Sequence, residues 1–185
     1  MATLNIGGTK IYRILGLLEW IQMRTRISEQ LEWLDSILNL SLKDTIIDFV
    51  FAQLHHPHHS ELWPAGNIDF TGDVIEKLEK FTEESGKPSI HFYGHTHGYS
   101  RGQSRDHHHL MVNVATAGGN IDYWDEYAQI DYPEYTISND EYGYVIVEVD
   151  AGQAPQFTLK RFSLGDGNCS LNNVCLLYTS DAADE

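Results

Sequence analysis

Basic residues are scarce in this sequence: 12 lysines and arginines stand against 27 aspartates and glutamates, which gives a formal net charge of -15. Proteins that bind nucleic acid need basic patches to meet the phosphate backbone, so we expect no nucleic-acid partner. The acidic residues are spread along the chain, as is typical of a solvated acidic surface. A phosphorylated small molecule is not excluded, because bound metal ions would supply positive charge locally.

Cysteine and long apolar segments are also nearly absent. The 2 cysteines, Cys169 and Cys175, lie close to the end of the sequence and cannot form a disulfide framework. No apolar run reaches the roughly eighteen residues of a membrane span, and the first residues lack the basic and apolar segments of a signal peptide. The composition is globular, 42% hydrophobic and 11% aromatic, and 185 residues suffice for one domain with a core.

Apolar periodicity predicts an alternation of strands and helices, followed by further strands. Strands are expected at residues 11–18, 45–54, 89–93, 109–116, 143–149 and 156–162, and helices at residues 28–40 and 72–84. Thr71 is the expected N-cap of the second helix, and Gly86 is expected to end it. The last two strands should form an antiparallel hairpin, and residues 120–142 a long ordered loop. This order predicts a layered α/β or α+β architecture, a sheet sandwich flanked by helices.

Two histidine clusters stand at the ends of two expected strands. HHPHH at residues 55–59 follows the strand at 45–54, and GHTHG at residues 94–98 follows the strand at 89–93. Neutral imidazole is the commonest protein ligand of transition metals. Open α/β sheets bind their ligands in loops at the carboxyl ends of strands. The two clusters therefore predict a metal site at one sheet edge.

The other histidines have different expected positions. His91 lies in the middle of an expected strand, which favours a place in the core or at a sheet edge. The three histidines at residues 107–109 are expected on a surface loop that enters a strand. We expect none of them to be a metal ligand.

Three blocks of the sequence, in their order and spacing, resemble the calcineurin-like metallophosphoesterases. QLEWL at residues 30–34 resembles the family's Gln-x-x-Trp-Leu helix, and QLHHP at residues 53–57 resembles its strand that ends in a ligand histidine. GHTHGYSR at residues 94–101 resembles its Gly-His-x-His-x-Tyr-x-Arg block, and the pattern is closest to the purple acid phosphatase-like branch. The resemblance covers residues 11–162. It implies a four-layer αββα sandwich, here partial, with the site at one sheet edge.

The resemblance implies a dinuclear phosphohydrolase that hydrolyses phosphate esters by attack of metal-activated hydroxide. Two metal ions, drawn from Fe, Zn or Mn, would be its cofactors, and two ions can clamp the attacking and leaving oxygens of a phosphoryl transfer. By the same resemblance, His55 and His95 would ligate the second metal and His97 the first. The implied substrate is a phosphorylated small molecule or another phosphoester, and the branch is often secreted or periplasmic.

Three further residues receive possible catalytic roles. His58 or His59, in the loop beyond Pro57, would protonate the leaving group or hold phosphate. Arg101 would contact phosphate, although a structural salt bridge is an equally good interpretation of this arginine.

The first three blocks of the family, Asp-x-His, Gly-Asp-x-x-Asp or Tyr, and Gly-Asn-His-Asp or Glu, do not occur in this sequence. They normally lie upstream and supply the bridging carboxylate and the remaining ligands. We therefore expect residues 1–165 to be the C-terminal portion of such a domain, without its N-terminal strands, and inactive alone. Residues 166–185 are expected to be a tail, and from about residue 176 they resemble a translated sequencing adapter, so they do not enter the fold prediction.

Two other functions remain open. The chain could be a noncatalytic metal-binding or interaction module whose aromatic loop, at residues 123–135, binds a partner. It could also be a mononuclear zinc hydrolase with three histidine ligands and a water. The sequence contains no His-Glu-x-x-His pattern, so this last interpretation lacks a clear general base.

Overall fold

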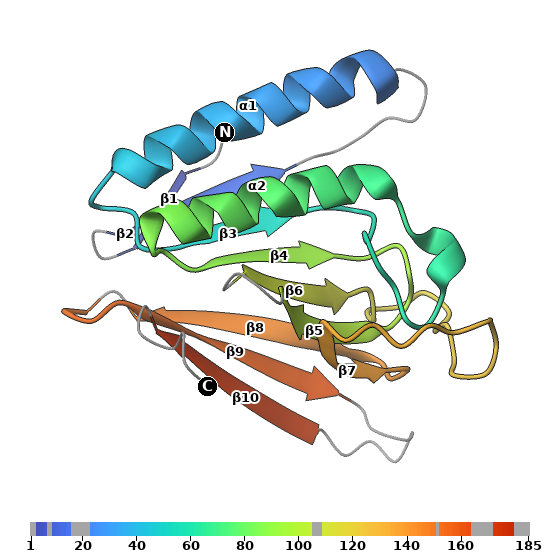
Figure 1. The fold of residues 1–185 in the computed structure, drawn as a ribbon. Coiled ribbons are helices and arrows are strands. Elements are labelled where there is room, and N and C mark those ends of the chain that lie inside the picture. Colours follow the sequence, from blue (N-terminus) through green and yellow to red (C-terminus); the bar gives the residue numbers. More distant parts are fainter. Residues whose placement is uncertain are drawn as a thin grey trace.

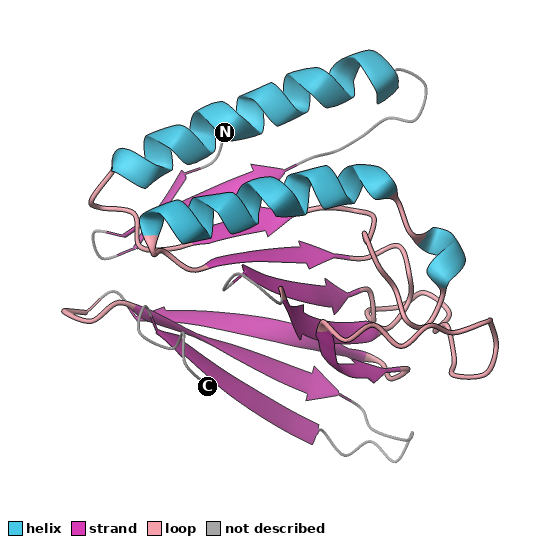
Figure 2. Ribbon diagram, in the orientation of Figure 1, coloured by secondary structure: helices cyan, strands magenta, loops and turns pink. Residues whose placement is uncertain are grey.

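Two β-sheets lie face to face, and two helices cover the outer face of the larger sheet (Figure 1, Figure 2). The computed structural model describes residues 3–6, 9–15, 23–104, 109–150, 152–163 and 172–179, and it describes side chains in residues 27–104, 109–150 and 152–163. The helices are α1 (Met23–Lys43), η1 (Pro64–Gly66) and α2 (Asp69–Ser85). The strands are β1 (Thr3–Ile6), β2 (Thr9–Leu15), β3 (Val50–Gln53), β4 (Ser89–Tyr93), β5 (Tyr99–Gln103), β6 (His109–Val114), β7 (Tyr135–Asn139), β8 (Gly143–Asp150), β9 (Gln156–Ser163) and β10 (Asn172–Thr179).

The larger sheet has a parallel centre and antiparallel edges. Its strand order is β1-β2-β3-β4-β6-β5-β7, and the smaller sheet has the order β10-β9-β8. Strands β2, β3, β4 and β6 pair in parallel, whereas β1, β5 and β7 run antiparallel to their neighbours. The carboxyl ends of β3 and β4 therefore meet at the same sheet edge, which brings the two histidine clusters together.

The layers enclose two main apolar clusters. The cluster between the helices and the larger sheet is formed by Leu34, Leu38, Val50, Ala52, Val74, Leu78 and Phe81. The cluster between the two sheets is formed by Phe49, Ile90, Tyr99, Leu110, Val112, Phe157 and Leu159. Because the larger sheet is buried on both faces, these clusters fix the register of its strands beside the site.

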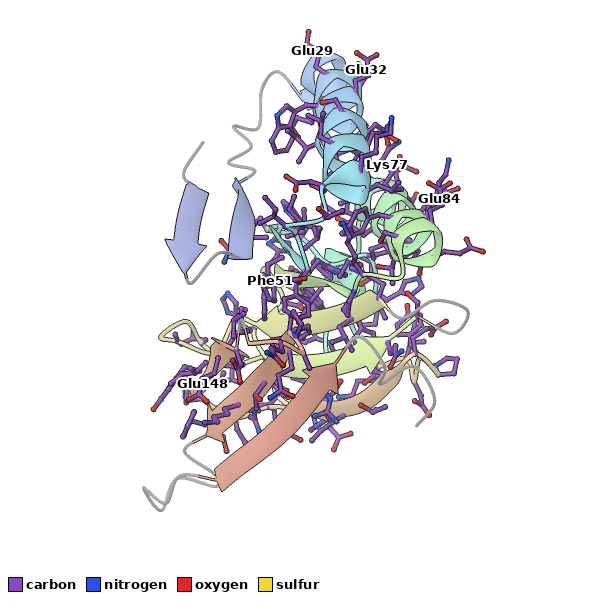
Figure 3. The ribbon with its side chains drawn as sticks, turned by 90° about the vertical axis from the view of Figure 1, so that its left-hand side faces the viewer. Glu29, Glu32, Phe51, Lys77, Glu84 and Glu148 are labelled. Atoms are coloured by element: carbon purple, nitrogen blue, oxygen red, sulfur yellow. The ribbon has the colours of Figure 1, made fainter. Side chains whose placement is uncertain are left out.

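Several glutamates project from the outer surface of the helices. Figure 3 shows Glu29, Glu32 and Glu84 projecting away from the sheets. The two helices are also joined by an ion pair, in which Lys77 Nζ lies 2.6 Å from Asp35 Oδ2. None of the helices described in this structure combines the length and the apolar composition that a membrane crossing requires.

The layered α/β architecture is confirmed, as a partial sandwich. The described residues supply one helical layer and two sheets, which are three of the four layers of an αββα sandwich. The expected strand at residues 89–93 is β4, and the expected hairpin is formed by β8 and β9, which pair in antiparallel orientation. Residues 16–18 of the first expected strand lie outside the described residues.

Several elements differ from the prediction. The strand expected at 45–54 is only β3: residues 45–46 form a turn in which Asp44 Oδ1 accepts a hydrogen bond from Ile46 N at 3.0 Å, and residues 47–49 lie outside the strand. Thr71 is not an N-cap: α2 begins at Asp69 after Ile68, and Thr71 Oγ1 donates to His56 O at 3.1 Å. Gly86 ends α2 with a left-handed φ of 67°, as expected.

Four strands, β1, β5, β7 and β10, were not predicted. Strands β5 and β7 pair with each other, and β7 lies within the loop expected at residues 120–142. Strand β10 lies within the segment expected to be a tail and pairs with β9 over its whole length.

Candidate metal centre

The histidine clusters meet because hydrogen bonding continues past the ends of β3 and β4. Leu54 N donates to Phe92 O at 2.9 Å, and Gly94 N donates to His55 O at 3.0 Å. These bonds extend the parallel pairing by one step beyond the two strands. His55 and His95 therefore project from adjacent points of the sheet edge.

Three imidazole rings converge at this edge. His55, His56 and His95, the histidine trio, offer ring nitrogens that all lie within 4.8 Å of one another. The ring centroids are 4.6 Å apart for His55 and His56, 4.3 Å for His56 and His95, and 5.2 Å for His55 and His95. Tetrahedral zinc with bonds of about 2.1 Å needs ligand nitrogens about 3.4 Å apart, so these nitrogens would have to move closer together to bind it.

The turn that carries His95 is strained and well supported. His95 has a φ of 68°, a left-handed conformation that costs a residue with a side chain about 1–2 kcal/mol. The next residue, Thr96, is buried and accepts two hydrogen bonds from Asn113 Nδ2, at 2.8 Å to its carbonyl and 3.0 Å to its hydroxyl. Thr96 N also donates to Gly94 O at 2.8 Å. These bonds hold His95 in the orientation that brings its ring to the trio.

The electrostatics of two members of the trio, His56 and His95, favour neutral rings. Burial, followed by the neighbouring His95 and His55, lowers the pKa of His56 to about 4. Burial is also the main cause that lowers the pKa of His95, with His55 and His97 adding to it and Asp122 opposing it. A histidine must be neutral to ligate a metal ion. His56 and His95 therefore present free lone pairs at neutral pH.

His97 lies beside the trio and has partners of its own. Its Nδ1 donates to Asn120 O at 2.6 Å, and its backbone N donates to Asp122 Oδ2 at 2.7 Å. The ring packs so closely on Gly119 that a Cβ there would lie 2.8 Å from His97 Cε1. Donation from Nδ1 leaves the lone pair on Nε2, which is the arrangement typical of metal-ligating histidines. The role of His97 as a ligand of the first metal stays a prediction.

His58 and His59 lie in a separate stack of rings. Their centroids are 4.1 Å apart, and His59 stacks on Tyr132 at 4.3 Å with an interplanar angle of 4°. The His58 ring covers Gly72 of α2, where a Cβ would lie 2.8 Å from His58 Cε1. Burial lowers the pKa of His59, with His58 adding to this and Glu134 opposing it. Both rings are held in place, and their expected roles with phosphate or leaving group stay predictions.

Arg101 is placed within the sheet. It lies in β5, and its Nη2 donates to Thr136 Oγ1 of β7 at 3.3 Å. Thr136 Oγ1 in turn donates to Arg101 O at 3.2 Å. The structure thus gives Arg101 a part in joining β5 to β7, and its contact with phosphate stays a prediction.

A buried carboxylate joins the loops around the site. Glu61 Oε1 accepts a hydrogen bond from Tyr132 N at 2.9 Å, and its other oxygen accepts one from Ser138 Oγ. Asn67 Nδ2 donates to Tyr132 OH at 3.1 Å. The loop after β3 and the loop before β7 therefore form one ordered unit beside the trio.

Sequence reasoning missed two features of this region. His56 was not among the expected ligands, although its ring belongs to the trio. His91 is buried in the core as expected, but His109 is also fully buried and not on a surface loop. His107 and His108 lie outside the described residues.

The two buried histidines form a polar chain below the site. His91 Nδ1 lies 2.8 Å from His109 Nε2, and His109 Nδ1 lies 2.7 Å from Ser89 Oγ. Ser89 Oγ lies 2.5 Å from Thr82 Oγ1 of α2. Burial, followed by His58, lowers the pKa of His91 to about 3. The hydrogen bonds among these side chains satisfy polar groups that would otherwise be costly to bury.

The comparisons with known proteins show a shared fold. Neither a protein-family model nor a curated protein sequence matches this chain. The solved structure of PhoD is similar, with a TM-score of 0.58 and 12% sequence identity over 97% of this chain and 42% of PhoD. GAP50, the anchor in the inner membrane complex of Plasmodium, has a TM-score of 0.57 and 12% identity. The match covers 96% of this chain and 52% of the GAP50 chain. The chain therefore spans about half or less of each of these structures.

Proposed function

We propose that this chain is the metal-binding portion of a dinuclear metal-dependent phosphohydrolase that hydrolyses phosphate esters. The observation that carries this proposal is the convergence of His55, His56 and His95 at the carboxyl ends of two parallel strands. The partial α/β sandwich shared with PhoD and GAP50 supports it at the level of the fold. The resemblance of the two histidine blocks to the metallophosphoesterases supplies the reaction class.

Two groups of residues would have separate roles, one in metal binding and one in contact with the phosphate or the leaving group. His55 and His95, with His56 in reach, would hold one metal ion, and His97 would offer Nε2 to the other. Bound metal ions of Fe, Zn or Mn would stabilise the charge that develops on a phosphoryl group and acidify a water molecule. The ring stack would hold phosphate or protonate the leaving group through His58 or His59.

Metal titration of the purified chain tests the trio. We expect Zn²⁺ to bind in calorimetry and His95→Ala to weaken this binding at least tenfold, because it removes one of three converging ligands. His58→Ala is the matched control, since its ring lies outside the trio, and should keep the parent affinity. Equal affinity in the parent and in His95→Ala would refute the site, provided that circular dichroism shows both to be folded.

The same titration tests whether His97 ligates a second metal ion. If His97 ligates a second ion, the parent binds two equivalents of Zn²⁺ and His97→Ala binds one. Inorganic phosphate should then bind the metal-loaded chain and not the metal-free chain. Phosphate binding that does not depend on metal would contradict the phosphohydrolase and favour the noncatalytic metal-binding or interaction module.

We expect the chain alone not to hydrolyse a phosphomonoester. The trio consists of histidines only, and within the described residues no carboxylate joins it as a bridge between two ions. The measurement is the rate of 4-nitrophenol release from 4-nitrophenyl phosphate in the presence of Zn²⁺ or Mn²⁺. A rate above that of the His55, His95 and His97 triple alanine variant would contradict this expectation.

A further inference from the structure

A half-buried tryptophan, Trp63, lies beside the histidine trio, and the loop next to it carries exposed aromatic side chains. Trp63, from the loop after β3, has its ring centroid 5.5 Å from that of His95 and 6.0 Å from that of Tyr127. Tyr127 belongs to the loop before β7, which also carries Tyr123 and Trp124. The exposed fractions of Tyr123, Trp124 and Tyr127 are 52%, 39% and 41%. We call Trp63, Tyr123, Trp124 and Tyr127 the aromatic rim.

The loop presents these rings from an ordered backbone. Tyr123 N donates to Glu126 Oε2 at 3.2 Å, and Trp124 N donates to Asp140 Oδ2 at 3.1 Å. At its start, Asp122 N donates to His97 O at 2.8 Å, which ties the loop to the candidate metal centre. An ordered loop backbone reduces the conformational entropy that is lost when a ligand stacks on the rings it carries.

The charge around the rim limits what it can bind. Asp122, Asp125 and Glu126 alternate with the aromatic residues along this loop. The Glu126 carboxylate is the main cause that raises the pKa of Tyr127, with burial and Asp122 adding to it. A second anionic group on a ligand would be repelled here, whereas an uncharged ring would not. The rim is therefore suited to a flat, uncharged group.

We propose that the aromatic rim is a leaving-group subsite, which stacks a planar, uncharged ring that is joined through a phosphoester to a phosphate held at the histidine trio. The proposal rests on the proposed function of the trio. The ring could be a nucleobase or an aryl group, because both offer the same π-face to Trp63 and Tyr127. Stacking on an aromatic side chain is tolerant of the ring's identity, so the subsite selects the class of ring and not one base.

Binding to the zinc-loaded chain tests the subsite. The ligands are glycerol 1-phosphate, phenyl phosphate and adenosine 5′-monophosphate, with inorganic phosphate as the reference. We expect the two ring-bearing esters to bind at least tenfold more tightly than glycerol 1-phosphate. Trp63→Ala should abolish this preference and leave inorganic phosphate unchanged, and Trp63→Phe should keep most of it. Phenyl phosphate and adenosine 5′-monophosphate distinguish an aryl subsite from a nucleobase subsite.

The matched control is Tyr144→Ala. Tyr144 is an exposed aromatic residue of β8, 49% exposed, and it lies outside the rim. It should keep the preference for ring-bearing esters. Two results would overturn the proposal. The first is equal affinity of the parent for glycerol 1-phosphate and the ring-bearing esters. The second is a preference for the ring-bearing esters that survives both Trp63→Ala and Tyr127→Ala.

A metal-free measurement separates this proposal from the function of the trio. Adenosine, which carries no phosphate, should quench tryptophan fluorescence weakly in the parent and less in Trp63→Ala, in which Trp124 remains. If inorganic phosphate fails to bind the zinc-loaded chain while adenosine still quenches, the phosphohydrolase fails and the ring-binding surface stands. If phosphate binds and adenosine does not quench, only the leaving-group subsite is refuted, and the proposed function of the trio stands.

Discussion

Replacing Phe157 with alanine should lower the free energy of unfolding by about 3–5 kcal/mol, the cost of removing a large buried aromatic side chain. Phe157 lies in β9 and is fully buried between the two sheets. Its ring makes edge contacts with Phe49 at 5.1 Å and with Phe51 at 5.3 Å. These contacts connect the smaller sheet to the segment that leads into the histidine trio.

Phe162 of the same strand provides the matched control. It lies on the opposite face of β9, half-buried, and stacks on the exposed Tyr144 at 5.0 Å. Phe162→Ala should cost about 1 kcal/mol, because the side chain is already partly in water. Urea unfolding of both variants measures the difference. Equal losses would mean that β9 does not pack against the larger sheet through the face that carries Phe157.

Strand β4 was predictable from the sequence through its apolar pattern, whereas β5 and β7 were not predicted. Strand β4 has the predicted bounds because Ile90, Phe92 and Tyr93 are apolar residues in a short run between Pro88 and the Gly94 turn. Strand β5, YSRGQ, lacks apolar alternation, and β7, YTISN, alternates over only four residues. Their strand conformation comes from pairing within the sheet, which only the tertiary structure reveals.

The candidate site was predictable in its location and only partly in its membership. Parallel pairing of β3 and β4 follows from the order of the elements, and this pairing brings His55 and His95 together. His56 joins them because the chain bends after β3, so that the alternation of side chains in a regular strand no longer applies to adjacent residues. No local signal in the sequence indicates this bend.

The buried position of His109 also depends on a partner strand. His109 pairs with Ser89 in the register of β4 and β6, and its two ring nitrogens meet Ser89 and His91. A histidine with both nitrogens bonded can be buried at low cost. The sequence alone places His109 next to other histidines and gives no information on the register.

Acidification from pH 7 to pH 5 should destabilise the metal-free protein, with His91 contributing about 2 kcal/mol of the loss. The pKa of His91 is about 3 in the folded protein and about 6.5 when it is exposed. Above the unfolded pKa, His91 is neutral in both states and its contribution is complete. As the pH falls below that value, the unfolded state takes up a proton that the folded state rejects, so stability is lost by up to about 1.4 kcal/mol per pH unit.

The comparison of His91→Phe with the parent isolates this contribution. His91 faces His109, Tyr93 and His58, and none of these is changed in the variant. His56, His59 and His95 also have lowered pKa values and titrate in both proteins, so they cancel in the difference.

The measurement is urea unfolding at several pH values between 5 and 7, with a chelator present so that metal release adds nothing. His91→Phe should lose less stability than the parent over this range, whatever its stability at pH 7, because phenylalanine takes up no proton on unfolding. Parallel stability curves for the two proteins would mean that His91 is not held neutral by the core, and the buried chain from His91 to Thr82 would then have to carry a charge.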